Sequence, residues 1–120
     1  MDERRRYVRL DTRLQISYTV LQKETETKIS ETMDISGGGI RVLLLDPIPL
    51  NALLKLTISL PDDSKPIVCS GKVVWVEEFS VLSAKKENRF EAGVFFTDID
   101  SKDRDRIIQY VILGYASLQK

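Results

Sequence analysis

The sequence contains no histidine and a single cysteine, Cys69. The missing histidine excludes Ser-His and Cys-His catalysis and nearly every common zinc or non-haem iron ligand set. One cysteine cannot form an internal disulfide, which suits a reducing cytoplasm, and within a strand-like segment it is expected to be a small buried hydrophobe. Phosphate loops of the Gly-Lys-Ser/Thr type and Gly-x-Gly-x-x-Gly turns are also absent. We therefore expect no enzymatic activity, no metal and no cofactor.

Net charge and long apolar segments are lacking as well. Lys plus Arg and Asp plus Glu each total 18, so the formal net charge is +0. No overall field would attract such a protein to nucleic acid or to an anionic membrane, and any anion site must be local. Residues 1–6 (MDERRR) contain no apolar core of a signal peptide, and no stretch approaches a membrane span. These patterns predict a soluble cytoplasmic protein.

Alternation of apolar and polar side chains, the period of half-buried strands, runs through most of the sequence. The 120 residues, 42% of them hydrophobic, suffice for one domain over 1–120 with a single core. Residues 25–33 have the weak pattern of an edge strand or a ligand rim, and Gly71 indicates a bulge or bend. The alternation predicts six strands, at 14–20, 25–33, 40–45, 54–60, 67–79 and 89–97.

Six short strands at hairpin spacing favour antiparallel pairing, and closing the sheet removes edges that a small domain cannot otherwise protect. The predicted fold class is all-β: a six-stranded antiparallel β-barrel of split-barrel type over 11–98, after a flexible Arg-rich arm at 1–10. Over 100–118 the period becomes helical. This helix is expected to cover one barrel end or to meet a second subunit, in a monomer or a homodimer. The residues that line its packing side are Ile107, Ile108, Val111, Ile112, Tyr115 and Leu118.

Two polar motifs interrupt these patterns. Residues 34–39, Asp-Ile-Ser-Gly-Gly-Gly, are interpreted as a turn between two strands. Three glycines in a row allow positive φ angles and a close approach to a ligand, while Asp34 and Ser36 supply a carboxylate and a hydroxyl. Most turns of this composition bond only their own backbone. The second motif is the arginine cluster of the arm, which alone would be a solvated tail.

The two motifs have a recognisable spacing. The arm reads Arg5-x-x-x-Arg9 and the turn reads Asp34-x-Ser36-x-x-Gly39. Their order, their separation by about two strands and the barrel with its C-terminal helix together resemble the PilZ domain family of bacterial cyclic di-GMP receptors. The resemblance covers essentially the whole chain. It implies that both motifs bind the ligand, and that a basic residue directly before the first motif accompanies binding of an intercalated pair of ligand molecules.

Arginine suits this ligand, because its fork bonds phosphate or the guanine O6/N7 edge and its plane stacks on a base. We hypothesise that Arg5 and Arg9 clamp phosphate and guanine from the arm. Asp34 would accept from the guanine N1–H edge or orient an arginine, and Ser36 would donate to phosphate. Trp75, in an apolar strand, is expected to belong to the core. The predicted site comprises Arg4, Arg5, Arg9, Asp34, Ser36, Gly38 and Gly39.

The predicted function is a cyclic di-GMP receptor that orders its arm over the ligand and relays the signal to an unidentified downstream protein. An alternative is a ligand-free adaptor of the same fold that works through its C-terminal helix, which the presence of both motifs disfavours. A third possibility, a single-stranded nucleic-acid binder, would need a basic groove with surface aromatics. The zero net charge disfavours that possibility.

Overall fold

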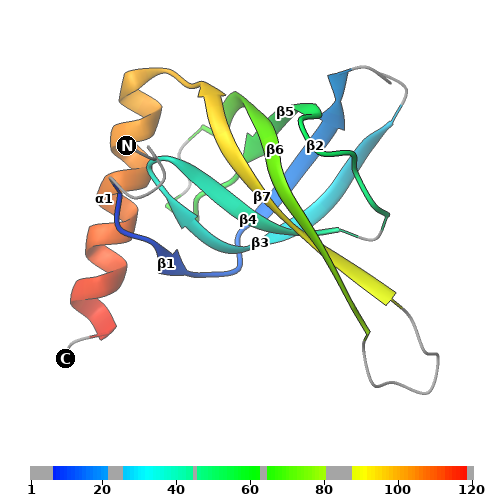
Figure 1. Ribbon diagram of the computed structural model, residues 1–120. Helices are drawn as coiled ribbons and strands as arrows, with labels where there is room; N and C mark the ends of the chain where they lie inside the picture. The colour runs from blue at the N-terminus through cyan, green and yellow to red at the C-terminus, as the bar shows by residue number, and fades with distance from the viewer. Residues whose placement is uncertain (1–6, 22–25, 45, 63–64, 81–87, 119–120) are drawn as a thin grey trace.

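The computed structural model describes residues 7–21, 26–44, 46–62, 65–80 and 88–118 (Figure 1). Six strands pair antiparallel in the order β3-β2-β5-β6-β7-β4, and β4 returns to pair with β3, so the sheet closes into a barrel. A short extra strand, β1, pairs with β3. The predicted fold class is confirmed. The elements are β1 (Leu10–Asp11), β2 (Gln15–Val20), β3 (Thr27–Ser36), β4 (Gly39–Leu44), β5 (Leu53–Ile58), β6 (Ile67–Ser80), β7 (Asn88–Asp98) and α1 (Ser101–Leu118).

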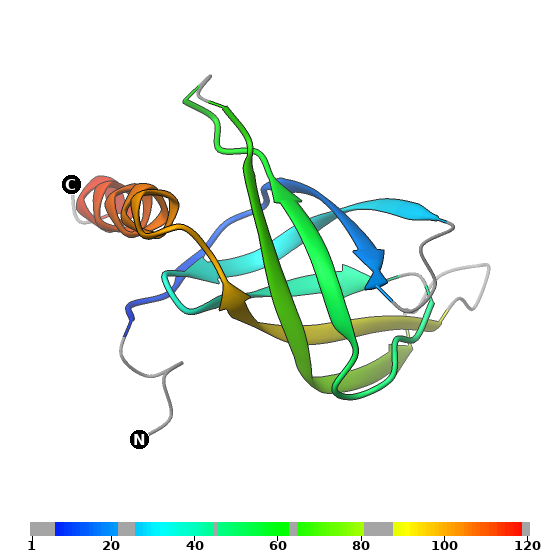
Figure 2. The same cartoon turned by 90° about the horizontal axis from the view of Figure 1, so that it is seen from above.

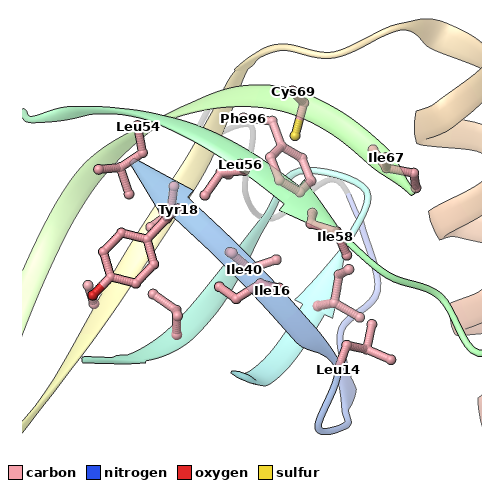
Figure 3. Close-up of a cluster of buried hydrophobic side chains, with 14 of the residues drawn as sticks. Leu14, Ile16, Tyr18, Ile40, Leu54, Leu56, Ile58, Ile67, Cys69 and Phe96 are labelled. Carbon is pink, nitrogen blue, oxygen red and sulfur yellow. The ribbon is translucent and has the colours of Figure 1, made fainter. Parts of the chain in front are cut away.

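The core lies inside the barrel and consists of the side chains on the inward face of each strand (Figure 3). Strand β5 shows the rule most clearly, because Leu54, Leu56 and Ile58 are completely buried while Leu53 and Lys55 face solvent. Successive side chains of a strand point to opposite faces, so the alternation in the sequence becomes an inside and an outside. The core-facing residues predicted from this alternation are confirmed for β5.

A β-bulge in β3 interrupts the alternation. Thr32 pairs with Val42 and Asp34 pairs with Arg41, so Met33 is an extra residue on the β3 side. Thr32 and Val42 are fully buried. In a regular strand, residues two positions apart lie on the same face, so without the extra residue Asp34 would point inward like Thr32. The bulge instead turns Asp34 to the outer face, opposite Arg41.

A second bulge in β6 has the same effect. Val73 pairs with the buried Val94, and Trp75 pairs with Gly93, so Val74 is extra. A Cβ at Gly93 would lie 2.0 Å from Trp75 Nε1, so the indole covers Gly93 on the outer face. Trp75 is only half-buried. The expectation that this tryptophan belongs to the core was wrong, because the bulge reverses the direction of its side chain.

Two predictions about strand regularity have opposite outcomes. The register of β6 against β7 shifts between Ser70 and Gly71, which confirms the predicted irregularity at Gly71. Of the two interpretations of residues 25–33, an edge strand or a ligand rim, the edge strand was wrong. Strand β3 pairs with β2 on one side and with β4 on the other, because closure of the barrel uses both of its edges.

Helix α1 stands beside the barrel, next to β1 and the turn between β3 and β4 (Figures 1 and 2). Asp100 Oδ1 accepts a hydrogen bond from the Lys102 N–H at 2.8 Å, which caps the first turn. Ile107 and Val111 are buried in the core cluster, as predicted. Ile112 and Tyr115 are exposed in the single chain, because only a narrow stripe of the helix meets the barrel. Within the described residues, no helix has the length and apolarity that crossing a bilayer requires.

The thiol of Cys69 is buried in the core beside β5. Burial, aided by the charges of Asp103 and Asp98, raises its pKa from 9.0 to about 12. Because the thiolate is the reactive form, only about one thiol in 10⁴ would be ionised at pH 8. We expect iodoacetamide to modify Cys69 at pH 8 only after denaturation, as measured by mass spectrometry. The stabilisation from keeping this thiol neutral persists below about pH 9 and is lost as pH rises toward 12. Rapid alkylation of the folded chain would contradict this assignment.

Candidate functional site

A row of residues crosses four strands on the outer face of the barrel, and we call it the outer row. Asp34 on β3 pairs with Arg41 on β4, Arg41 pairs with Gly93 on β7, and Gly93 pairs with Trp75 on β6. The two bulges turn both ends of the row outward. Gly93 has no side chain, so the indole of Trp75 can lie across β7 toward β4. The outer row therefore combines a carboxylate, a guanidinium and an aromatic plane.

Two arginines balance the charge of Asp34. Arg9 Nη1 donates to Asp34 Oδ1 at 2.8 Å, and Arg41 Nε lies 3.0 Å from Asp34 Oδ2. The side chain of Asp34 is only 10% exposed, whereas those of Arg9 and Arg41 are 40% and 33% exposed. Burying a carboxylate without a partner is costly, so the two guanidinium groups compensate for its desolvation.

Arg41 is balanced in charge but incompletely hydrogen-bonded. Its Nε is buried and makes no hydrogen bond with any described residue, although Asp34 Oδ2 is 3.0 Å away, so this contact is an ion pair whose N–H is not aimed at the oxygen. On its other side, Arg41 Nη1 lies 3.7 Å from Glu91 Oε2. That distance is too long for a hydrogen bond. In contrast, Arg9 makes a short, well-directed hydrogen bond to the same carboxylate.

Residues 7–9 connect this carboxylate to helix α1. A Cβ at Gly37 would lie 2.7 Å from Tyr7 Cδ1 and 2.9 Å from Ile108 Cγ1, so the tyrosine ring and the helix meet over the glycine turn. Arg104 Nη1 donates to Tyr7 Oη at 3.0 Å. The same region holds a mostly apolar cavity of about 170 Å³, which is lined by Tyr7, Val8, Gly37, Ile108, Val111 and Ile112.

The glycine turn is shorter than predicted. Asp34 and Ser36 belong to β3, the turn is Gly37-Gly38, and β4 begins at Gly39. Across the described ranges no glycine has a positive φ, so the expected left-handed backbone was wrong. Close packing explains Gly39 instead, because a Cβ there would lie 2.1 Å from the carbonyl oxygen of Val94.

Ser36 closes this hairpin. Its hydroxyl accepts the Gly38 N–H at 3.1 Å and lies 3.4 Å from the Gly39 carbonyl oxygen. Ser36 is completely buried. In this structure the hydroxyl is engaged by its own turn, which is the local bonding typical of such sequences.

The structure brings part of the predicted site together. Arg9 and Asp34 are in direct contact, and Ser36, Gly38 and Gly39 form the adjacent hairpin. Arg4 and Arg5 lie outside the described residues. These positions place one residue of the first motif against the first residue of the second motif.

Sequence reasoning missed Arg41, Glu91 and Tyr7 and excluded Trp75 from the site. Arg41 could have been found, because it follows Gly39 by two positions in an alternating strand. Its partner Asp34 could not be assigned to the same face, since period-two alternation without the bulge puts it inside. Tyr7 gave no signal, because it lies in a charged segment with no period.

Solved structures share this fold. Inhibitor of motility (MotI/DgrA) from Bacillus subtilis matches 98% of this chain and 54% of its own, with a TM-score of 0.80 and 25% identity. The PilZ domain of YcgR from Escherichia coli, solved with c-di-GMP, matches 98% of this chain and 95% of its own, at TM-score 0.75 and 14% identity. The MrkH–c-di-GMP complex from K. pneumonia matches 98% and 54%, at TM-score 0.76 and 20% identity. This chain spans about half the length of MotI and of MrkH.

The sequence itself carries the family pattern. The comparison of this sequence with curated proteins found no match. A family model described as PilZ domain matches residues 3–113, which include both arginine positions of the arm and the whole glycine turn. With the barrel, the C-terminal helix and the contact between the two motifs, this match establishes that the chain belongs to the PilZ domain family.

Proposed function

We propose that this chain is a receptor for cyclic di-GMP, which binds over the outer row. The observation that carries this proposal is the 2.8 Å bond between Arg9 and Asp34, because it joins the two motifs at one point on the barrel. The complexes of YcgR and MrkH with c-di-GMP support the ligand class. The outer row and the adjacent Arg9 suit guanine, because Trp75 and Arg9 offer flat partners and Asp34 offers an acceptor for the N1–H edge.

Charge balance assigns a role to the arm. Arg9 and Arg41 carry two positive charges and Asp34 and Glu91 carry two negative charges, so these four side chains sum to zero. Cyclic di-GMP brings two phosphates. The remaining positive charge would come from Arg4 and Arg5, which follow the chain N-terminal to Arg9. We assign Arg9 to a ligand phosphate or guanine, with Arg4 and Arg5 clamping from outside.

Signal output would pass through helix α1. If Arg9 moves to the ligand, Tyr7, two residues away, would shift against Gly37 and Arg104. Such a shift would reshape the apolar cavity between the arm and the helix. A downstream protein could bind the exposed apolar residues of the arm and of helix α1, which are Val8, Ile112, Leu113 and Tyr115.

The arm relay predicts a protection experiment. Cyclic di-GMP should slow trypsin cleavage after Arg5 and Arg6, because ordering the arm over the ligand removes the extended conformation that a protease needs. Cleavage is followed by mass spectrometry, with cyclic di-AMP at the same concentration as the control. Equal cleavage rates with both dinucleotides would contradict ordering of the arm.

Calorimetric titration with cyclic di-GMP tests the receptor function. Cyclic di-AMP and GTP serve as controls: cyclic di-AMP differs from cyclic di-GMP in its bases, and GTP lacks the second nucleotide. Two ligands per chain would support the intercalated pair that Arg4 implies, and one would contradict it. The fluorescence of Trp75, the sole tryptophan, gives a second readout at the outer row. A folded chain that gives neither heat nor a fluorescence change would contradict the receptor function and favour the ligand-free adaptor.

A further inference from the structure

We propose that Arg41, which lies outside both motifs, is a positioning residue that holds Asp34 when Arg9 moves to the ligand. The identity of that ligand rests on the proposed function. The charge relation among Arg9, Asp34 and Arg41 does not, because it is present in the chain alone. Arg41 acts through Asp34 rather than by touching the ligand.

The two cations of Asp34 differ in how they are held. Arg41 lies within β4, and its backbone pairs with Asp34 on β3 and with Gly93 on β7. Arg9 precedes the two-residue strand β1, where the chain enters the barrel. A residue paired on both sides in a closed barrel cannot leave its place without breaking the sheet, whereas a residue at the entry of the chain can. Arg41 is therefore the fixed cation and Arg9 the exchangeable one.

The N–H of Arg41 Nε offers the Asp34 carboxylate a second hydrogen bond. Arg41 Nε is buried and has no hydrogen-bond partner in the part of the chain that the structure describes, while the neighbouring Asp34 carboxylate directs Oδ1 toward Arg9. A buried donor without a partner is unfavourable. If Arg9 leaves, a small rotation of the Asp34 carboxylate satisfies this N–H and keeps the buried negative charge paired. The exchange thus replaces one hydrogen bond of Asp34 by another.

Glu91 supports this assignment from the other side. It lies 3.7 Å from Arg41 Nη1 and its side chain is only 17% exposed. The guanidinium of Arg41 therefore stands between two carboxylates, Asp34 and Glu91. This setting directs its donors along the barrel surface and away from an incoming phosphate.

Removing Arg41 should weaken ligand binding. Asp34 would then have only Arg9 as a cation, and a ligand that takes Arg9 would leave this buried carboxylate without a positive partner, since guanine is neutral. We expect Arg41→Gln to weaken cyclic di-GMP binding at least about 10-fold. Arg41→Lys keeps the charge beside Asp34 and should bind within about threefold of the wild type.

The matched control for charge is Lys55→Gln. Lys55 is exposed on β5, which lies opposite β4 in the barrel order, so this variant removes the same charge far from Arg41. Its affinity should stay within about twofold of the wild type. Unchanged affinity in Arg41→Gln, or an equal loss in Arg41→Gln and Lys55→Gln, would overturn the inference.

A second measurement needs no ligand. If Arg9 and Arg41 share Asp34, either arginine alone can balance the charge of the carboxylate. Loss of both arginines leaves the buried carboxylate unpaired. The thermal midpoint of the Arg9→Ala, Arg41→Gln double variant should fall by at least about 4 °C more than the sum of the single variants. This excess should disappear in the Asp34→Asn background. Additive losses, or an excess that persists without the carboxylate, would overturn the shared role.

The two measurements separate the possible failures. A wild-type chain that does not bind cyclic di-GMP refutes the proposed function, and the thermal cycle then decides the role of Arg41 alone. A wild-type chain that binds while Arg41→Gln binds equally well refutes only this inference.

Discussion

Replacing Arg9 with alanine is expected to weaken cyclic di-GMP binding roughly 30-fold to several thousandfold. A charged hydrogen bond that is desolvated in a complex costs about 2 to 5 kcal/mol when one partner is removed. Arg9 is the described arginine of the arm and already points its guanidinium at the outer row. Calorimetric titration of the variant against the wild type measures the loss directly.

The control for this variant is Arg13→Ala. Arg13 pairs with Glu31 at 3.0 Å, but both side chains are largely exposed, so their pair adds little. Its removal should change the affinity less than about twofold. The Arg9→Ala chain should still fold, because Arg41 continues to balance Asp34. An Arg9→Ala variant with the affinity of the wild type would refute the clamp.

The second large effect concerns folding. Gly39→Ala should lower the free energy of unfolding by about 3 kcal/mol or more, because the new methyl group would lie 2.1 Å from the Val94 carbonyl oxygen. That oxygen belongs to the backbone of β7, so relief requires β4 and β7 to separate. Urea denaturation followed by circular dichroism measures the change in stability.

Gly114→Ala provides the comparison, since it adds the same methyl group in helix α1. The atom it would meet is Leu10 Cδ2, at 2.3 Å, which is the tip of a flexible side chain. Alanine also gains about 1 kcal/mol of helix propensity over glycine. The stability of this variant should lie within about 1 kcal/mol of the wild type. Equal losses at Gly39 and Gly114 would show that the backbone contact is not decisive.

Much of the fold could be predicted because alternation reports which face of a strand is buried. The residues Leu54, Leu56 and Ile58 alternate with Lys55, Thr57 and Ser59, and all three apolar residues are in the core. The closed barrel followed from the number and spacing of the strands. The helix was predicted from its period, but the period cannot tell how wide a stripe the barrel covers, and Ile112 and Tyr115 are exposed in the single chain.

The candidate site could be predicted only in part. Arg9 and Asp34 were identified because the two motifs have a known spacing, and the structure brings them into contact. Arg41 and Trp75 were missed or excluded for a common reason. The direction of Trp75 and the contact of Arg41 with Asp34 each depend on a bulge, and the extra residues Met33 and Val74 leave no mark in the amino-acid pattern.

The amino-acid sequence by itself determined the barrel, its core and the two motifs, because hydrophobic alternation and motif spacing act through short stretches of chain. The tertiary structure decided which side chains share the outer face. Strand register is set by pairing between distant segments, and a single bulged residue reverses the direction of everything that follows it. For this reason Asp34, Arg41 and Trp75 meet in one row only after the sheet has closed.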